Sequence, residues 1–304
     1  MINYVVGMDG GGTKTDILVA DIDGRPLHAF RSGAINYNGE SVENVERHLS
    51  DIFEKIEVLM GGLTHCSALC IGAAGISNSA AANAMTEAVR KTGYSGPLTV
   101  TGDHETALYG ALGKPWGVIL IAGTGSICYG KNASGETHRT GGFGYLIDDE
   151  GSGYAIGRDI LAAVVRAHDG RLGGTVLTEM VFSALGFSSI QDIVSFVYGK
   201  DTNKRDIAAL SPYLAPACAQ HDQAAMMIAE KCSMELTELV VPVVEKLSLG
   251  NGEIALAGSI LIKDEVIRSG FERKIKDVYP DMACILPKNS AAHGAVQMAL
   301  NLFY

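Results

Sequence analysis

Two stretches of the chain repeat one layout, and this repetition constrains the fold more than any other feature of the sequence. Residues 4–24 comprise a β-rich run, a polar glycine turn, a second β-rich run and a closing Asp23-Gly24 turn. Residues 117–135 follow the same order, with a GTGS turn between the runs and Ser134-Gly135 at the end. Each stretch predicts a strand–turn–strand hairpin. Because the layout occurs twice, we expect two similar lobes that each open with a hairpin.

The segments around the hairpins alternate helical and strand patterns. Apolar residues at three- and four-residue spacing predict helices, and short β-rich runs lie between them. In the first part of the chain we expect helices at 41–60, 79–92 and 104–113, with strands at 68–72 and 98–101. After residue 150 we expect helices at 154–168, 175–184, 190–198, 204–220, 223–247, 263–278 and 291–302, with strands at 254–257 and near 284–286. Strands that alternate with helices predict an α/β fold.

The length of 304 residues is too great for one ordinary core and suits two lobes of about 150 residues each. We place an N-terminal α/β lobe at 1–115 and a helix-rich C-terminal α/β lobe at 116–290. We expect the last helix, within 291–304, to pack back on the first lobe.

Composition excludes several classes of function. The 34 acidic and 24 basic residues leave a net charge of −10, which is the wrong sign for a protein that binds nucleic acid or an anionic membrane. Six scattered cysteines without a CxxC pattern indicate reduced thiols. No apolar run approaches the ~20 residues of a membrane span, and the start of the chain lacks the pattern of a signal peptide. We therefore expect a cytoplasmic protein with a small-molecule ligand.

Two glycine turns have the chemistry of phosphate sites. Residues 9–15, DGGGTKT, match neither a Walker loop nor a Rossmann fingerprint, because those loops open a helix and this turn opens a strand. Its glycines would let a phosphate approach the backbone amides, and Thr13 would add a hydroxyl. The turn at 123–126, GTGS, offers the same groups. A single turn of this kind is usually only structural, but two in duplicated positions favour phosphate binding.

Acidic and amide side chains mark four further positions. Asp9 ends the first strand beside the glycine turn, where it would suit Mg²⁺ or would cap the turn. Asp103 follows a strand and precedes a helix, so it is either an N-cap or a residue placed for chemistry. The loop 141–154 sets three consecutive acids among glycines and serines, which suits a polyhydroxylated ligand or an acidic surface loop. Asn36 lies in a loop at 33–39, for which an ordinary turn is the alternative.

These motifs resemble those of a known family. MDGGGTKTD at 8–16 is similar to its first phosphate motif, GTGS at 123–126 to its second and LAGS at 256–259 to its adenosine motif. GGFGYLIDDEGSGYAIGR at 141–158 resembles its sugar loop, and TGD at 101–103 matches the strand end with the catalytic Asp. On these motifs the chain is identified as a member of the BadF/BadG/BcrA/BcrD group of the sugar kinase–Hsp70–actin superfamily. Within that group it resembles the N-acetylglucosamine kinases.

The resemblance implies two ribonuclease H-like, or actin-like, lobes with the ligand in the cleft between them. It implies that ATP phosphates contact Gly11, Gly12, Thr13, Lys14, Thr124 and Gly125, and that the nucleoside contacts Gly258 and Ser259. The amino sugar would contact Asn36, Asp103, Ser126, Gly142, Phe143, Gly144 and Asp149. Asp103 would also be the catalytic base, while Asp9 remains the candidate metal ligand. Four positions depart from the family pattern, since Phe143, Tyr145 and Asp148 replace the usual Trp, His and Gly, and Ala155 stands where Trp is common.

The resemblance further implies a homodimeric, ATP- and Mg²⁺-dependent kinase that phosphorylates an amino sugar at O6. N-acetylglucosamine is the expected substrate, and N-acetylmuramate is a further candidate. The same family contains iron–sulfur ATPases that activate 2-hydroxyacyl-CoA dehydratases and benzoyl-CoA reductases, but their KCAAGTGRF-like cysteine segment is absent here. A non-catalytic sensor of sugar or nucleotide is the third interpretation.

Overall fold

The computed structural model describes residues 2–37, 40–76 and 79–303. The chain divides into two compact units, which we call unit 1 and unit 2. Unit 1 consists of Met1–Trp116 together with Pro287–Tyr304, and unit 2 consists of Gly117–Leu286. Each unit contains one five-stranded sheet.

The sheet of unit 1 has the strand order β3-β2-β1-β4-β5. Its strands are β1 (Tyr4–Gly10), β2 (Lys14–Asp21), β3 (Pro26–Gly33), β4 (Cys66–Ala73) and β5 (Leu98–Gly102). The first three strands pair antiparallel through short turns, whereas β4 and β5 run parallel to β1. Because β1, β4 and β5 run parallel, their carboxyl ends lie at the same end of the sheet. The glycine turn after β1 and the residue after β5 therefore lie toward that end.

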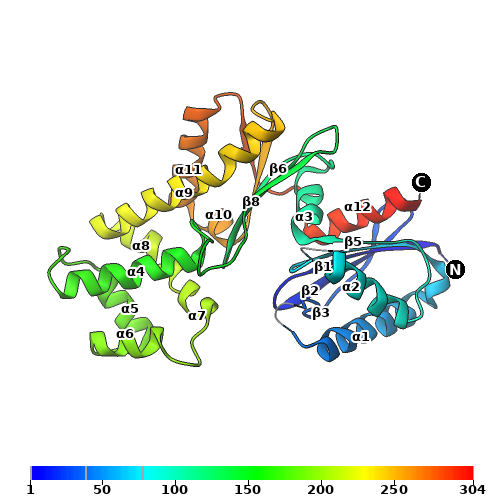
Figure 1. Cartoon of the computed structure of the whole chain (residues 1–304), viewed down its shortest axis with the longest axis horizontal. Coiled ribbons are helices and arrows are strands. Elements are labelled where there is room, and N and C mark those ends of the chain that lie inside the picture. The colour runs from blue at the N-terminus through cyan, green and yellow to red at the C-terminus, as the bar shows by residue number, and fades with distance from the viewer. Residues whose placement is uncertain (1, 38–39, 77–78, 304) are drawn as a thin grey trace. The chain divides into compact units, whose positions relative to one another are not determined.

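Helices cover both faces of this sheet (Figure 1). One face packs against α1 (Val42–Met60) and α2 (Ser79–Lys91), and η1 (Leu63–His65) follows α1. The other face packs against α12 (Ala291–Phe303), with α3 (Asp103–Leu112) beside it. The approach of α12 to β1 requires a glycine, because a Cβ on Gly7 would collide with the backbone of Ala292 and Val296.

The sheet of unit 2 repeats this pattern in the order β10-β9-β6-β7-β8. Its strands are β6 (Gly117–Ala122), β7 (Ser126–Lys131), β8 (Thr137–Gly141), β9 (Glu253–Ala257) and β10 (Ala283–Ile285). Again three strands pair antiparallel, and β9 and β10 run parallel to β6. The duplicated, hairpin-led sheet predicted from the sequence is therefore confirmed. The third strands, β3 and β8, were not expected, because their sequences lack a clear β-rich run.

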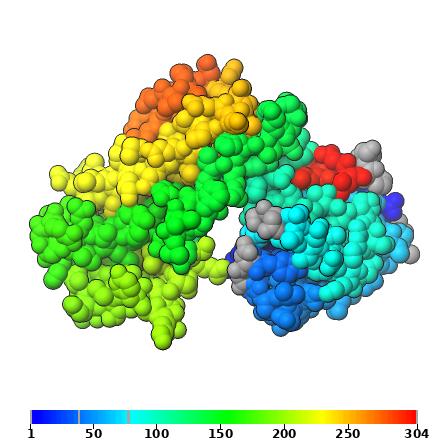
Figure 2. Space-filling view, viewed as in Figure 1, coloured from blue at the N-terminus to red at the C-terminus, as the bar shows by residue number. Residues whose placement is uncertain are grey.

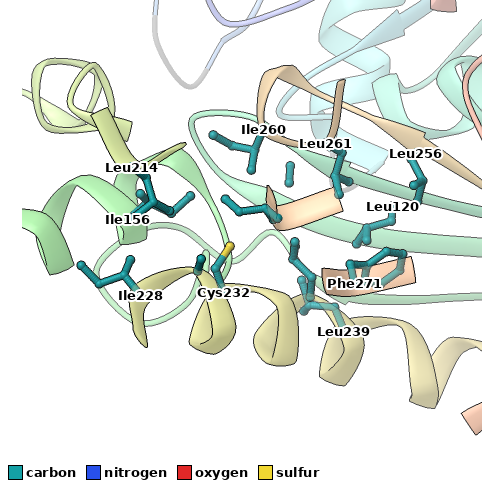
Figure 3. Close-up of a cluster of buried hydrophobic side chains, with 14 of the residues drawn as sticks. Leu120, Ile156, Leu214, Ile228, Cys232, Leu239, Leu256, Ile260, Leu261 and Phe271 are labelled. Carbon is teal, nitrogen blue, oxygen red and sulfur yellow. The ribbon is translucent and has the colours of Figure 1, made fainter. Parts of the chain in front are cut away.

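Most of unit 2 is helical. Its helices are α4 (Gly153–His168), α5 (Leu177–Leu185), α6 (Ile190–Val197), α7 (Lys204–Ala208), η2 (Ser211–Tyr213), α8 (Leu214–Ala219), α9 (Gln223–Leu247), α10 (Ser259–Lys263) and α11 (Glu265–Val278). Figure 3 shows Leu120, Ile156, Leu239, Leu256 and Phe271, from five different elements, meeting in one buried cluster. The long helix α9 packs against α11, and the two form the yellow and orange surface in Figure 2.

Two expected helices are wrong in their bounds. The segment 204–220 is not one helix but α7, η2 and α8, because Pro212 has no backbone N–H to continue a helix. The helix expected at 263–278 begins only at Glu265, where the Asp264 side chain caps it by accepting from the Ile267 N–H. A separate short helix, α10, precedes it.

The six cysteines are free: Cys66, Cys70, Cys128 and Cys232 are buried, and Cys218 and Cys284 are partly buried. Among the described residues no single helix has the length and apolar character to cross a membrane. The helices α5 and α6 together reach that length and composition, but they are bent by 63° at the break between them.

Candidate active site

The turn between β1 and β2 presents exposed groups at the edge of the unit 1 sheet. It is closed by one backbone hydrogen bond, from Gly11 N–H to Lys14 O at 2.9 Å. Gly12 and Thr13 are exposed between these residues. The Lys14 ammonium lies 2.8 Å from Asp16. A phosphate could thus reach Thr13 without rearrangement of the turn, whereas Lys14 already has a carboxylate partner.

Asp9 and Asp103 form a pair of interacting carboxylates in unit 1. Burial, together with the negative charges of Asp103 and Asp16, raises the pKa of Asp9 to about 7, although Lys14 opposes the shift. Among the described residues no donor forms a hydrogen bond with the Asp9 carboxylate, so the sequence alternative of an Asp that caps its own turn finds no support there. The charge of Lys14 thus offsets only part of the effect of burial and of the two neighbouring acids on Asp9.

The structure assigns the N-cap of α3 to Gly102 and makes Asp103 the first helical residue. The alternative that Asp103 is the N-cap is wrong. Its side chain is 43% exposed, with His104 Nδ1 3.6 Å from one carboxylate oxygen. A carboxylate at this position is favoured by the helix dipole and remains accessible to a ligand.

The donor set of this region fits Mg²⁺. The ion prefers oxygen ligands and is usually held by one or two carboxylates, with phosphate oxygens and water completing its coordination. Asp9 supplies such a carboxylate, and a divalent cation would offset the burial and the neighbouring negative charges that raise the pKa of Asp9. In the described part of the chain no group of three or more His, Cys, Asp or Glu is arranged to hold a metal.

Asn36 follows β3 in the same unit. Its carbonyl accepts a hydrogen bond from Glu40 N–H at 3.0 Å. The preceding residue, Ile35, is fully buried, and His48 Nδ1 contacts Ala34 O at 2.7 Å. Asn36 thus directly follows a segment that buried contacts hold in place. Residues 38–39 of the same loop lie outside the described residues.

In unit 2 the GTGS turn is joined to the first residues of α4. Gly123 N–H donates to Gly125 O at 2.9 Å and closes the turn. Gly153 N–H then donates to Gly123 O at 2.7 Å, and Tyr154 N–H donates to Thr124 O at 3.3 Å. The turn and the start of α4 are therefore held as one piece.

A pocket of about 390 Å³ opens beside this turn, entirely within unit 2. Thr124 and Ser259 line it, together with the cationic side chains Arg205 and Lys263. The adjoining Gly258 has a φ of +86°, and a Cβ there would collide with Ala122 at the end of β6. Only glycine lets the turn after β9 lie this close to β6.

Neither Arg205 nor Lys263 was predicted from the sequence as a site residue. Both occur in segments with an ordinary amphipathic pattern, and no spacing rule connects them with Thr124. The pocket therefore brings together residues far apart in the chain, with two positive charges that would suit phosphates.

The second half of the sugar-loop candidate, 149–152, is anchored to β7. Asp149 is 4% exposed, and one of its oxygens accepts from Ser126 N–H at 3.2 Å. The Ser126 hydroxyl donates to Glu150 O at 2.6 Å. A Cβ on Gly125 would lie 2.8 Å from Asp149. Burial raises the pKa of Asp149, while the Ser126 N–H and the charge of Lys204 lower it.

The first half of the loop, 142–148, is exposed or half-buried. The Arg139 guanidinium lies 4.6 Å from the centre of the Phe143 ring, and Phe143 N–H donates to Asp148 Oδ2 at 2.7 Å. Tyr145 packs edge-on against Tyr154 at 4.9 Å. Two of the departures from the family pattern, Phe143 and Asp148, thus contact each other and shape the loop locally.

The structure groups the sequence-predicted residues within each unit. Unit 1 carries Asp9, Gly11, Gly12, Thr13, Lys14, Asn36 and Asp103, and unit 2 carries Thr124, Gly125, Ser126, Gly142, Phe143, Gly144, Asp149, Gly258 and Ser259. Within unit 2, Ser126 and Asp149 are in direct contact, and Thr124 and Ser259 share the pocket.

Known proteins are similar to the chain over its full length. The N-acetylmuramic acid/N-acetylglucosamine kinase of Clostridium acetobutylicum is 35% identical over 301 residues, which are 98% of both chains. The N-acetyl-D-glucosamine kinase of Dictyostelium discoideum is 29% identical over 97% of both chains. The crystal structure of a candidate N-acetylglucosamine kinase from Chromobacterium violaceum has a TM-score of 0.79 at 24% identity, covering 100% of this chain and 99% of that one.

The crystal structure shares the fold, and the α/β, actin-like architecture expected from the motifs is thereby confirmed. A sequence model of the BadF/BadG/BcrA/BcrD ATPase family matches residues 6–299. The match extends from the first strand to the last helix and includes every quoted motif. The chain therefore belongs to the BadF/BadG/BcrA/BcrD ATPase family.

Proposed function

We propose that the chain is an ATP-dependent kinase that phosphorylates an amino sugar at O6, with N-acetylglucosamine as substrate and N-acetylmuramate as a second one. The observation that carries this proposal is the 35% identity, over 98% of both chains, to a relative named for kinase activity on these two sugars. Because the likeness spans both units, neither unit lacks a counterpart in that relative. Membership in an ATPase family supports ATP as the phosphoryl donor.

The nucleotide would bind through the turns and the unit 2 pocket. The amides of the GTGS turn and the Thr124 hydroxyl suit phosphate oxygens, as do the exposed groups of Gly12 and Thr13. Gly258 and Ser259 would lie beside the nucleoside. Arg205 and Lys263 would balance the negative charge of the phosphates, since both line the same pocket.

The acceptor sugar would bind to the loop 141–154. Asp149 retains one carboxylate oxygen beyond its bond to Ser126 N–H, and this oxygen can accept from a sugar hydroxyl. Ser126, Gly142, Phe143 and Gly144 complete the proposed contacts in unit 2. From unit 1, Asn36 would donate or accept through its side-chain amide.

Asp103 would accept the proton of the attacking hydroxyl. Its exposed carboxylate at the start of α3 is accessible and is not used as a helix cap. Asp9 would hold Mg²⁺, which neutralises phosphate charge when bound. The chain's own contribution is then to orient the two substrates and to take up one proton, as in other phosphoryl transfers.

A coupled assay of ADP release tests this function. We expect ADP release to depend on N-acetylglucosamine or N-acetylmuramate, and phosphorus NMR of the product to show a phosphate ester on C6. Glucose and ATP without sugar are the controls. A redox activator would instead release ADP at the same rate whether or not a sugar is present. It would also show the visible absorbance of an iron–sulfur cluster.

A further inference from the structure

The helix α9 also holds the sugar loop, in addition to β7. Gly151 N–H donates to Glu235 Oε2 at 2.9 Å, and Cys232 Sγ donates to Gly151 O at 3.4 Å. Figure 3 shows Cys232 on α9 within the buried cluster of unit 2. Both polar groups of the Gly151 backbone are thus bonded to α9, although α9 begins more than seventy residues later in the chain.

The backbone at this point has an uncommon conformation. Asp149 has a φ of +67° and Gly151 a φ of +72°, on either side of Glu150. A left-handed φ is unfavourable for a residue with a side chain, and Asp tolerates it better than most. Gly151 also lies against Leu236, because a Cβ there would be 2.7 Å from that side chain. Such a conformation persists only when surrounding contacts hold it.

Glu235 is well suited to that task. Its side chain is only 12% exposed, and Lys231 Nζ lies 3.5 Å from one of its oxygens. Lys231 in turn lies 2.6 Å from Asp159 on α4, which also pairs with Arg158. A largely buried carboxylate is costly unless it is paired and hydrogen-bonded. Here one oxygen faces the cation and the other accepts from the loop.

The hydrogen bond between Gly151 and Glu235 lies close in the chain to two parts of the proposed site. Gly151 is two residues from Asp149, the proposed sugar ligand, and two from Gly153, which is bonded to the GTGS turn. Loss of the Glu235 acceptor would leave the Gly151 N–H without its partner. The segment that holds Asp149 in its left-handed conformation would then lose one of its contacts, while those to Ser126, Cys232 and Gly123 remain.

We propose that Glu235 is a positioning residue for the sugar loop: by accepting from Gly151 N–H it sets the place of the Asp149 carboxylate. The role of that carboxylate rests on the proposed function, but the anchoring of the loop does not. Glu235 touches neither substrate, and its effect on sugar binding passes through the loop.

Four variants separate this role from others. Glu235→Ala removes the acceptor, and Glu235→Gln keeps an acceptor oxygen but removes the charge. Lys231→Met removes the partner cation and leaves the acceptor in place. Glu238→Ala is the matched control, because Glu238 is an exposed glutamate on the same helix.

The first measurement is hydrogen exchange of the peptide 148–154 in the ligand-free protein. We expect Glu235→Ala to speed exchange there by about tenfold, as for the loss of one hydrogen bond of ~1.4 kcal/mol. Glu235→Gln, Lys231→Met and Glu238→Ala should match the wild type within about twofold. Unchanged exchange in Glu235→Ala, or a rise of equal size over all of unit 2, overturns the proposal.

The second measurement is steady-state kinetics with N-acetylglucosamine and ATP. Glu235→Ala should raise the KM for the sugar about tenfold and leave the KM for ATP within about twofold, with Glu235→Gln restoring the sugar KM. If Gln and Lys231→Met are as impaired as Ala, the charge pair rather than the loop bond matters, and the proposal is wrong. A wild type without sugar kinase activity would refute the proposed function, whereas the exchange measurement would still decide the anchoring.

Discussion

The carboxylates of the two units are stabilised in different ways. In unit 1, burial and the charge of Asp103 raise the pKa of Asp9 to about 7, and among the described residues no N–H group donates to Asp9. In unit 2, Asp149 is also buried, but Ser126 N–H and the charge of Lys204 counter the effect of burial. In the described part of the chain Asp149, unlike Asp9, thus accepts a hydrogen bond from a backbone N–H of the protein itself.

This difference indicates different tasks. A carboxylate that already accepts a backbone N–H is fixed in place and suits recognition of a hydroxyl with a defined direction. Carboxylates that repel each other suit a mobile proton or a cation. We therefore expect substitutions in unit 1 to affect turnover and cation binding, and those in unit 2 to affect ligand affinity.

The largest expected effect is that of Asp103→Asn in unit 1. Asn keeps the shape but cannot take up the proton, so kcat should fall by ~10²–10⁴. Since Gly102 is the N-cap, the melting temperature should change little. Glu105→Gln is the control, because it also removes one negative charge from the first turn of α3. A variant with more than about half of the wild-type kcat would show that Asp103 is not the base.

Asp149→Asn tests the recognition role in unit 2. Asn tolerates the left-handed backbone and can still accept from Ser126 N–H, so the loop should keep its conformation. Loss of a charged acceptor for a sugar hydroxyl costs ~1.5–3 kcal/mol, which should raise the sugar KM at least about tenfold while the KM for ATP stays constant. Asp201→Asn, at an exposed position of the same unit outside the loop, is the control. An increase confined to ATP would assign Asp149 to the nucleotide instead.

Thr124→Val addresses the phosphate turn of unit 2. The substitution preserves shape and removes one hydroxyl, and a neutral hydrogen bond is worth ~1 kcal/mol. The KM for ATP should rise about fivefold, and the sugar KM should not change. Thr13→Val should act in the same direction through the turn of unit 1. Thr137→Val, at an exposed position on β8, is the control. Unchanged ATP kinetics in Thr124→Val and in Thr13→Val would exclude the two turns as phosphate contacts.

The smallest expected effect concerns Asp9 and pH. A carboxyl whose pKa rises from 3.8 to about 7 on folding stabilises the protein only while it is protonated, so this contribution is lost as pH rises through about 7. Without divalent cations, Asp9→Asn should therefore melt a few degrees above the wild type at pH ~8 and near it at pH ~4.

Thermal unfolding with and without Mg²⁺ checks this prediction. The cation should raise the melting temperature of the wild type at alkaline pH and have a smaller effect on Asp9→Asn. Asp51→Asn, exposed on α1, is the control. As the pH rises from acidic to alkaline, the melting temperature of the wild type should fall relative to that of Asp9→Asn. If it does not, the raised pKa of Asp9 is contradicted.

Local patterns predicted the hairpins, most helices and the family, because strand alternation, helical spacing and turn glycines are written in consecutive residues. Where tertiary context decides, prediction failed. The edge strands β3 and β8 form because a hairpin strand is already present to pair with them. The segment 204–220 breaks at Pro212 into three pieces that pack around α4 and α9.

The same limit applies to the candidate site. Asp103, Asp149 and the two glycine turns were identifiable because each lies in a short motif with its own chemistry. Arg205 and Lys263 were not, since they reach the pocket beside Thr124 only through the packing of α7 and α10. Nor could sequence spacing distinguish Glu235, which contacts Gly151, from the exposed Glu238 three residues later.

The sequence by itself determined the duplicated α/β plan and the chemical types at the phosphate turns and the sugar loop. These features depend on hydrogen bonds between residues close in the chain and on the spacing of apolar side chains, both of which can be read from a short stretch of sequence. Only the tertiary structure decided that Gly102 rather than Asp103 caps α3, that Asp149 is bonded to Ser126, and that α9 holds Gly151. These outcomes depend on burial and on groups distant in the chain, because the pKa of a carboxylate and the conformation of a loop are set by whatever packs against them.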